Sequence, residues 1–558
     1  MHIMKKIFKY LSFGLLSTVF TATPSIAADR IAFYYPPFGE FTLKTESLEV
    51  FAKSGKINSD FSFYASRAKP QQLAQLRELL QQRFQLTPTL VSQFTYSPIG
   101  EEVVQRLGEL IQTETRQNGF YAIRGALIVA AAEPQGLTVV NVLRRFPSDT
   151  VRINFTEGLG VVSNLTELLK TRDKIVSLIQ KEANTEAANS PVDFSTKADL
   201  RSLGSFRILK KSLQLKDQSR SRRLPVDLYL PQGQGSAPST SPYPLIVISH
   251  GVASDRFAFV YLANHLTSYG FAVVVLEHPG SNAERFQRYF SGLADPPEPA
   301  ELINRPIDVK FVLDELQRLE KSDPDIQGKL NFQQVGAFGH SYGGYTVLSL
   351  AGAKINFQQI RHDCNPNNSL NVSLLLQCRA NELTPGNYPL KDDRIKAIFA
   401  INPFASSIFG ESGVSQVKIP TLLIAGSQDI VTPPVAEQIR PFTWLSTPDK
   451  YLALVENASH FTAVAEPTPE NNVLPVPPAL LGPDRTDAHD YFNALSVAFF
   501  KTYLLNRPEY RVYLQPSYAK YISKAPLNLS ILQSNATTQL TSFVKPIKQS
   551  GESAKPRP

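Results

Sequence analysis

The sequence has few cysteines and, beyond its N-terminus, no long apolar run. Only 2 cysteines and 1 tryptophan occur among 558 residues, which excludes a disulfide-rich fold and a multi-cysteine metal site. Beyond the N-terminus no apolar run reaches the roughly 18–20 residues that a membrane helix needs, and the longest, residues 126–132, is too short. The apolar fraction of 42% and the charged fraction of 19% are typical of a globular chain.

The net positive charge is also small outside the two ends of the chain. The formal net charge is +8, but lysines at positions 5, 6 and 9 and a basic tail from residue 545 onward supply much of it. No stripe of Lys and Arg is interleaved with aromatic residues. We therefore expect no nucleic-acid partner.

Residues 1–27 have the three parts of a secretory signal peptide. Lysines precede an apolar stretch at residues 11–22, and a small-x-small motif follows at residues 25–27. This pattern predicts cleavage near Ala27 or Ala28 and export to the periplasm or the extracellular space. A membrane anchor is the alternative, against which the shortness of the apolar stretch argues.

The two cysteines, Cys364 and Cys378, lie in one stretch rich in Asn and Pro. In an exported protein such a pair predicts a disulfide, and closing so short a loop stabilises the fold by about 3 kcal/mol. Two independent buried thiols are the alternative. No histidine lies at metal-ligand spacing from either cysteine, so we expect no zinc site and no cofactor.

The apolar periodicity divides the chain into five segments. The segments are a signal peptide (1–27), a mostly helical domain with strand-like ends (28–158), a helical linker (159–205), an α/β catalytic domain (206–545) and a disordered tail (546–558). We see no catalytic constellation in the helical domain. We expect a small helical domain with its own core. The alternative is that it gates the entrance of the second domain or contacts a partner.

Six short apolar runs between residues 245 and 455 alternate with helix-length segments. This alternation predicts a mostly parallel sheet with helices on both faces, whose ligands bind at the carboxyl ends of the strands. Insertions at residues 280–304 and 355–393 are long enough to act as lids or binding loops. The apolar runs occupy residues 245–249, 271–276, 335–338, 397–401, 421–425 and 451–455.

One of these runs leads directly into the motif Gly339-His340-Ser341-Tyr342-Gly343, and an apolar helix pattern follows it. A GxSxG motif between a strand and a helix is typical of a nucleophile elbow, in which the serine hydroxyl is presented at a sharp turn. The sequence therefore predicts Ser341 as a nucleophile. The preceding His340 is expected to point away from the site.

A serine nucleophile needs a base and an acid that orients the base. His460 follows the last apolar run, and Asp429 follows the run before it, which gives the chain order Ser–Asp–His. We predict these two residues as base and acid. Asp429 could instead be a turn aspartate ahead of a proline, in which case Asp308 or Glu456 is the next candidate for the acid.

Two backbone amides are predicted to form the oxyanion hole. One is the N–H of Tyr342, the residue after the nucleophile. The other is the N–H of Val252, in the loop His250-Gly251-Val252 that follows the run 245–249. Losing one such donor typically lowers the rate by about 10²–10³-fold.

Residues from about 206 to 505 resemble the α/β-hydrolase superfamily. Within this region, residues 244–251, 270–278 and 339–344 are similar to platelet-activating-factor acetylhydrolases and to the dienelactone-hydrolase-like serine esterases. The N-terminal region resembles the helical domain of unknown function that precedes such hydrolases in some exported bacterial proteins. The resemblance implies hydrolysis of short-acyl or phospholipid-like esters.

The sequence departs from the acetylhydrolase pattern at the acid. Acetylhydrolases of that branch carry the acid after the strand that follows the nucleophile helix, but residues 400–404 contain no carboxylate. Asp429 lies one strand later, as in dienelactone hydrolases. The predicted triad therefore resembles that of the dienelactone group more closely.

Taken together, these patterns predict an exported, cofactor-independent serine hydrolase that cleaves carboxylic esters through an acyl-enzyme. The expected partner is a small-molecule or lipid ester, and a peripheral contact with a membrane is left open, as is the oligomeric state. The alternatives are a polyester, thioester or lactone hydrolase of the same fold, a peptidase, or a non-catalytic binding protein that uses the helical domain.

Overall fold

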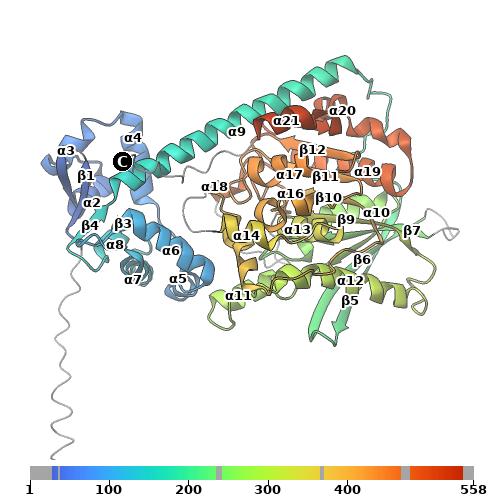
Figure 1. Cartoon of the computed structure of the whole chain (residues 1–558), viewed down its shortest axis with the longest axis horizontal. Coiled ribbons are helices and arrows are strands. Elements are labelled where there is room, and N and C mark those ends of the chain that lie inside the picture. Colours follow the sequence, from blue (N-terminus) through green and yellow to red (C-terminus); the bar gives the residue numbers. More distant parts are fainter. Residues whose placement is uncertain (1–27, 36–37, 234–241, 365–369, 467–477, 545–558) are drawn as a thin grey trace, which may run out of the picture. The chain divides into compact units, whose positions relative to one another are not determined.

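The computed structural model describes residues 28–35, 38–233, 242–364, 370–466 and 478–544. The predicted signal peptide and the predicted tail at 546–558 lie outside these residues. The chain divides into two compact units. The first ends at Thr166 and also includes Phe290–Leu293, whereas the second comprises Glu167–Tyr289 and the chain from Ala294 onward. Figure 1 labels the helices and strands of both units.

The first unit combines helices with a four-stranded sheet whose strand order is β2-β1-β4-β3. Strand β1 pairs antiparallel with β2 and parallel with β4, so the two ends of the predicted helical domain meet in one sheet. The strands are β1 (Arg30–Tyr35), β2 (Gly39–Lys44), β3 (Ile111–Gln112) and β4 (Thr150–Ile153). The helices are α2 (Thr45–Ser54), α3 (Ser59–Ala65), α4 (Pro70–Gln81), α5 (Pro88–Thr95), α6 (Pro98–Leu110), α7 (Phe120–Ala131) and α8 (Val139–Arg144).

Helix α9 (Phe155–Asn189) is 35 residues long, and from Glu167 onward it belongs to the second unit. Ile175, Ile179 and Ala183 recur at helical spacing and are buried in one hydrophobic core of that unit. The second half of this helix is thus an integral part of the larger unit. In the described part of the chain, no helix is both long and apolar enough to cross a bilayer.

The second unit is built on a nine-stranded sheet with strand order β13-β12-β11-β10-β9-β7-β8-β6-β5. The six strands from β12 to β8 in this order run parallel, and the strands beyond them pair antiparallel. The predicted mostly parallel sheet is confirmed. The strands are β5 (Arg207–Asp217), β6 (Arg222–Gln232), β7 (Tyr243–Ser249), β8 (Ala272–Leu276), β9 (Leu330–His340), β10 (Ile395–Ile401), β11 (Thr421–Gly426), β12 (Lys450–Val455) and β13 (Leu529–Gln533).

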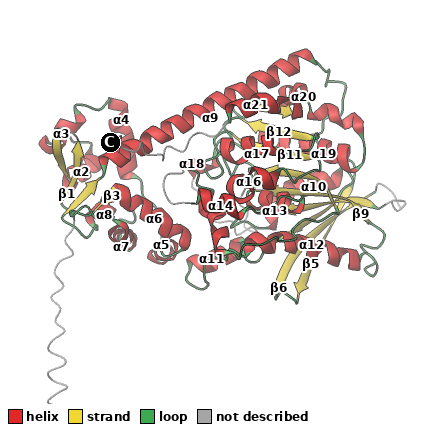
Figure 2. Ribbon diagram, viewed as in Figure 1, coloured by secondary structure: helices red, strands yellow, loops and turns green. Residues whose placement is uncertain are grey.

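Helices cover both faces of this sheet (Figure 2). The main helices are α10 (Val260–Ser268), α11 (Ala283–Phe290), α12 (Glu301–Leu319), α13 (Tyr342–Leu350), α14 (Phe357–Asp363), α15 (Leu374–Gln377), α16 (Ser406–Val414), α17 (Arg440–Trp444), α18 (Pro478–Leu481), α19 (Thr486–Leu504), α20 (Pro516–Ile522) and α21 (Thr537–Phe543). Shorter helical turns are η1 (Arg256–Phe259), η2 (Cys378–Glu382), η3 (Val435–Ile439), η4 (Pro508–Leu514) and η5 (Ser534–Ala536).

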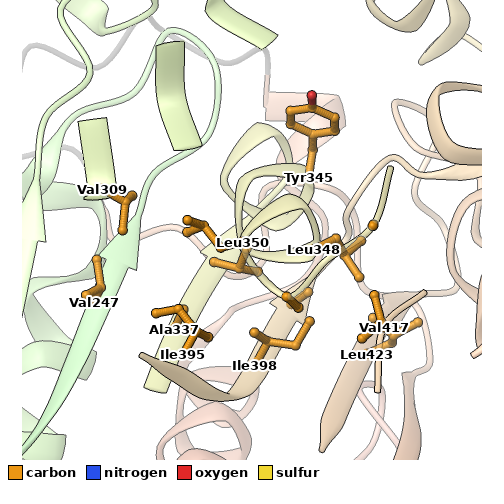
Figure 3. Close-up of a cluster of buried hydrophobic side chains, with 14 of the residues drawn as sticks. Val247, Val309, Ala337, Tyr345, Leu348, Leu350, Ile395, Ile398, Val417 and Leu423 are labelled. Carbon is orange, nitrogen blue, oxygen red and sulfur yellow. The ribbon is translucent and has the colours of Figure 1, made fainter. Parts of the chain in front are cut away.

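The two faces of the sheet carry separate hydrophobic cores. Successive strand residues alternate between them, so Val247 packs in the core with α12 and α13, whereas Ile246 packs in the core with α10 and α19. Figure 3 shows the first of these cores, where Leu348 and Leu350 of α13 lie over strand residues. These contacts hold α13 against the sheet, and with it the turn at Ser341 that precedes the helix.

A disulfide closes a loop within the insertion after α13. Cys364 and Cys378 form a disulfide across this insertion, as the sequence predicted. The buried carboxylate of Glu437 accepts hydrogen bonds from the amides of Ala405 and Ser406 after β10 and from the Gln377 side chain beside the disulfide. The insertion is thus tied to the loops at the carboxyl ends of the strands.

Candidate active site

Ser341 lies at the sharp turn between β9 and α13. Its backbone angles are φ 55° and ψ −116°, a conformation that non-glycine residues rarely adopt. The turn is tight because a Cβ at Gly339 would lie 2.1 Å from the Gly343 carbonyl oxygen, and a Cβ at Gly343 would lie 1.9 Å from that of Ser249. Only glycine fits at these two positions, so the motif forms the predicted elbow geometry.

The structure brings Ser341, His460 and Asp429 together although they are far apart in the sequence. The Ser341 Oγ lies 2.9 Å from the His460 Nε2, and the His460 Nδ1 lies 2.7 Å from the Asp429 Oδ2. Because a carboxylate oxygen accepts, the Nδ1–H donates to Asp429, which leaves the Nε2 to accept the serine proton. The arrangement can therefore move a proton off the Ser341 hydroxyl.

Asp429 rather than the two alternative carboxylates contacts His460. Its Oδ1 accepts the amides of Val431 and Thr432, both at 2.8 Å, and its Oδ2 accepts the Thr432 hydroxyl at 2.8 Å. These donors fix the carboxylate in the orientation that the imidazole needs. Asp308 instead contacts two arginines and another histidine, and Glu456 accepts a hydrogen bond from the side chain of Asn528.

Asn402 occupies the strand end where the acetylhydrolase pattern would place an acid. It has a positive φ of 46°, and its Oδ1 accepts the Gly426 amide at 3.0 Å. Its Nδ2 lies 3.4 Å from the carbonyl oxygen of His460 and donates to it. Asn402 thus links the loops that carry the acid and the base, a role the sequence analysis missed although this polar residue ends a predicted strand.

His340 is not remote from the site, which corrects the expectation that it points away. It follows Phe338 on the strand face that packs against α10, but the His460 backbone passes over it, and the His340 Nε2 donates to the His460 carbonyl oxygen at 2.9 Å. Burial, together with the neighbouring His460, lowers the pKa of His340 to about 3. His340 is therefore uncharged, and its hydrogen bond holds the backbone of His460 in place.

The two predicted oxyanion donors flank Ser341. A Cβ at Gly251 would lie 3.4 Å from the Ser341 Cβ, so the loop after β7 passes directly beside the nucleophile. Within the described residues, neither the Val252 amide nor the Tyr342 amide donates to a protein acceptor. Both N–H groups are therefore free to bind a substrate oxygen.

A cavity of about 470 Å³ opens beside His460. Its walls are mostly apolar, and the described residues contribute as polar side chains, besides His460, the amides of Gln428 and Asn457 and the hydroxyl of Ser459. The apolar lining residues are Ile430, Val431, Phe461, Leu480, Gly482, Pro483 and Pro526. None of the described residues that line this cavity is Asp, Glu, Lys or Arg. Among the described residues, no cluster of three or more His, Cys, Asp or Glu is arranged to hold a metal.

Two family models match parts of the chain. Residues 27–154 match the family described as alpha/beta hydrolase of unknown function (DUF1400), and residues 225–301 match platelet-activating factor acetylhydrolase, isoform II. These matches agree with the nine-stranded sheet and its helices. The chain belongs to the α/β-hydrolase superfamily. No curated protein matches it.

The matched ranges of this α/β-hydrolase support a hydrolase function of the esterase type. The first range falls in the unit with the four-stranded sheet, and the second covers the part of the larger unit from β6 to the start of α12. Ser341, Asp429 and His460 lie outside both ranges. The assignment of these three side chains therefore rests on their geometry.

The α/β-hydrolase contains a second array with the same three residue types. The Ser249 Oγ lies 2.9 Å from the His278 Nε2, and the His278 Nδ1 lies 3.0 Å from the Asp308 Oδ2. All three side chains are completely buried. Burial, reinforced by the charges of Arg305, Arg222 and Arg220, holds the pKa of His278 well below its usual value. This buried array is not accessible to a substrate, and its histidine resists protonation.

Proposed function

We propose that the chain is an exported serine esterase that cleaves carboxylic esters through a Ser341–His460–Asp429 triad. The observation that carries the proposal is the position of the His460 ring, whose two nitrogens lie within 2.9 Å of Ser341 and 2.7 Å of Asp429. The disulfide Cys364–Cys378 is compatible with export.

The proposed reaction proceeds in two halves. As the Ser341 oxygen bonds to the acyl carbon, its proton passes to the His460 Nε2, and the carbonyl becomes an oxyanion bound by the Val252 and Tyr342 amides. Collapse of this intermediate breaks the bond to the alcohol, which leaves with the proton from His460. Water then attacks the acyl-enzyme by the same route in reverse, releasing the acid and restoring the serine.

Short-acyl or phospholipid-like esters are the proposed substrates. The match of residues 225–301 to platelet-activating factor acetylhydrolase supports this class, and the apolar cavity beside His460 is suited to an apolar part of the substrate. A polyester, thioester or lactone would meet the same triad. Comparing esters of graded acyl length with a thioester and a lactone distinguishes these substrates.

The decisive experiment measures hydrolysis of a small chromogenic acetate by the purified mature protein. We expect turnover by the wild type and only background turnover by Ser341→Ala. A fluorophosphonate probe, located by peptide mass spectrometry, should modify Ser341. Modification of another serine, or turnover that survives Ser341→Ala, would contradict the proposal.

A further inference from the structure

Arg305 of α12 is a completely buried cation that lies between the two predicted oxyanion donors. Its Nη2 donates to the carbonyl oxygen of His250, in the loop after β7. On the other side, its guanidinium carbon lies 4.5 Å from the centre of the Tyr342 ring, and its Nε lies 3.3 Å from the Thr346 Oγ1 in the first turn of α13. One guanidinium thus contacts both elements that supply an oxyanion amide.

His250 fixes the next peptide of the same loop. Its Nδ1 lies 2.7 Å from the Gly251 carbonyl oxygen, and its Nε2 lies 3.1 Å from the His278 amide nitrogen. Because a carbonyl accepts and an amide donates, the ring carries its proton on Nδ1 and accepts at Nε2. Both ring nitrogens are occupied, so the imidazole cannot rotate without breaking a buried hydrogen bond.

This hydrogen bond determines the direction of the Val252 amide. In a trans peptide the C=O and the N–H of one plane point in opposite directions. The Gly251 carbonyl points toward the His250 ring, so the Val252 N–H of the same peptide points to the other side, away from the buried interior. The Arg305 contact with the His250 carbonyl fixes the preceding peptide plane in the same way.

We propose that His250 and Arg305 are positioning residues that hold the Val252 and Tyr342 amides in register as one oxyanion hole. The inference rests on the proposed esterase function and adds the residues that orient its backbone donors. Neither side chain touches the substrate, and each acts through a peptide or a ring that borders the nucleophile.

Stability of the fold alone does not account for this arrangement. Among the described residues no carboxylate forms a salt bridge with Arg305, whose contacts are hydroxyl groups, a backbone carbonyl and an aromatic ring. Burying a cation without a direct counter-ion is costly, and an apolar side chain of similar size would avoid that cost. What the guanidinium provides, and an apolar side chain would not, is a fixed geometry for two backbone segments.

The first test compares His250→Phe with His265→Phe. His265 is also buried and also contacts a backbone carbonyl, that of Leu200, but it lies in α10 away from the site. We expect His250→Phe to lower kcat for the chromogenic acetate by about tenfold to a hundredfold with KM changed less than about threefold, because misplaced donors weaken only transition-state binding. His265→Phe should keep the wild-type kcat.

A boronic acid that forms a tetrahedral adduct with Ser341 provides a readout that a purely structural role would not change. Its affinity should fall in His250→Phe and in Arg305→Lys by the same factor as kcat/KM, because both quantities depend on the oxyanion hole. The far-ultraviolet circular dichroism of each variant should match that of the wild type. Equal kcat values in His250→Phe and the wild type, or an equal loss in His265→Phe, would overturn the inference.

A crystal structure of the wild-type boronate adduct tests the inference if a variant does not fold. One boronate oxygen should lie about 3 Å from both the Val252 and the Tyr342 amide nitrogens, with His250 still bonded to the Gly251 carbonyl. A boronate oxygen held elsewhere, or a flipped Gly251 peptide, would refute it. If wild-type turnover is absent or survives Ser341→Ala, the proposed function itself fails, which is a different outcome from an active enzyme indifferent to His250.

Discussion

Two Ser–His–Asp arrays of nearly equal geometry lie in the same unit. They differ in the exposure of their side chains and in the charges around the histidine. In both arrays the serine oxygen lies 2.9 Å from the histidine Nε2. Ser341, His460 and Asp429 retain 3–5% exposure, whereas Ser249, His278 and Asp308 retain none. The distances therefore support a nucleophile only together with the exposure of the serine and the sharp turn on which it lies.

The two arrays differ in the charges around the histidine. Asp308 forms salt bridges with Arg222 and Arg220, and those two cations together with Arg305 oppose protonation of His278. Asp429 instead accepts only neutral backbone and hydroxyl donors besides the imidazole. A base must accept a proton during the reaction, so the surrounding charge as well as the geometry separates the site from the buried array.

The serines provide the largest expected contrast. Ser341→Ala should lower kcat by about 10⁴-fold or more, since removing a nucleophile leaves only binding and the oxyanion hole. Fluorophosphonate labelling should disappear with it. Ser249→Ala should still be labelled at Ser341, and intact-protein mass spectrometry of the wild type should show a single adduct. A second adduct on the peptide that contains Ser249 would remove the distinction between the arrays.

Replacing each aspartate with asparagine should affect activity in one array and stability in the other. Asp429→Asn should lower kcat by about 10⁴-fold because the imidazole loses the acceptor that sets its tautomer. Asp308→Asn removes one of the two carboxylate partners of Arg222 and of Arg220, which keep Glu301 and Asp217, and should destabilise the unit by about 1–3 kcal/mol. Urea unfolding followed by the fluorescence of Trp444, the only tryptophan, measures the second effect. A stable Asp308→Asn protein would contradict this account of the buried array.

The main elements of the catalytic unit could be predicted because their signals are local. Strand runs, the GxSxG turn and polar residues at strand ends are all readable within a few residues, and they led to Ser341, Asp429 and His460. The side chain of His460 lies within hydrogen-bonding distance of both Ser341 and Asp429. Their catalytic roles stay predictions until the variants are measured.

The supporting residues could not be predicted because their partners are distant in sequence. Asn402 meets the loop of His460, and Arg305 meets the loop of His250, only after the strands have assembled. The four-stranded sheet of the first unit likewise depends on pairing β1 with β4 from opposite ends of a helical segment. The apolar periodicity of the sequence does not predict such contacts.

Acid should destabilise the fold through its buried histidines, including His278 of the second array. Burial lowers the pKa of His265 and of His489 to about 4 and that of His278 well below its usual value, so the unfolded chain binds more protons as the pH falls below about 6.5. Stability rises with pH wherever the unfolded state binds more protons, so the unfolding free energy should fall between pH 6.5 and 4. The slope is about 1.4 kcal/mol per pH unit for each such histidine.

The contribution of the buried array to this slope can be isolated. His278→Gln should remove about one proton from the pH dependence of the unfolding free energy, measured by urea titration of the Trp444 signal at several pH values. An unchanged slope would mean that His278 binds a proton in the folded state as readily as in the unfolded chain. Resistance of its histidine to protonation would then no longer characterise the buried array.

The smallest expected effect comes from removing the Thr432 hydroxyl, which donates a hydrogen bond to Asp429. The Thr432 Oγ1 lies 2.8 Å from the Asp429 Oδ2 and 3.3 Å from the His460 Nδ1, so it helps to hold the carboxylate against the imidazole. Thr432→Val keeps the volume but removes one donor to a charged group, a loss of about 1.5 kcal/mol, or roughly tenfold in kcat. Thr502→Val is the matched control, because the Thr502 hydroxyl is buried and contacts only the Ala498 carbonyl within α19. Steady-state kinetics should show the loss in the first variant alone, and an unchanged kcat in Thr432→Val would mean that the backbone amides of Val431 and Thr432 suffice to orient the acid.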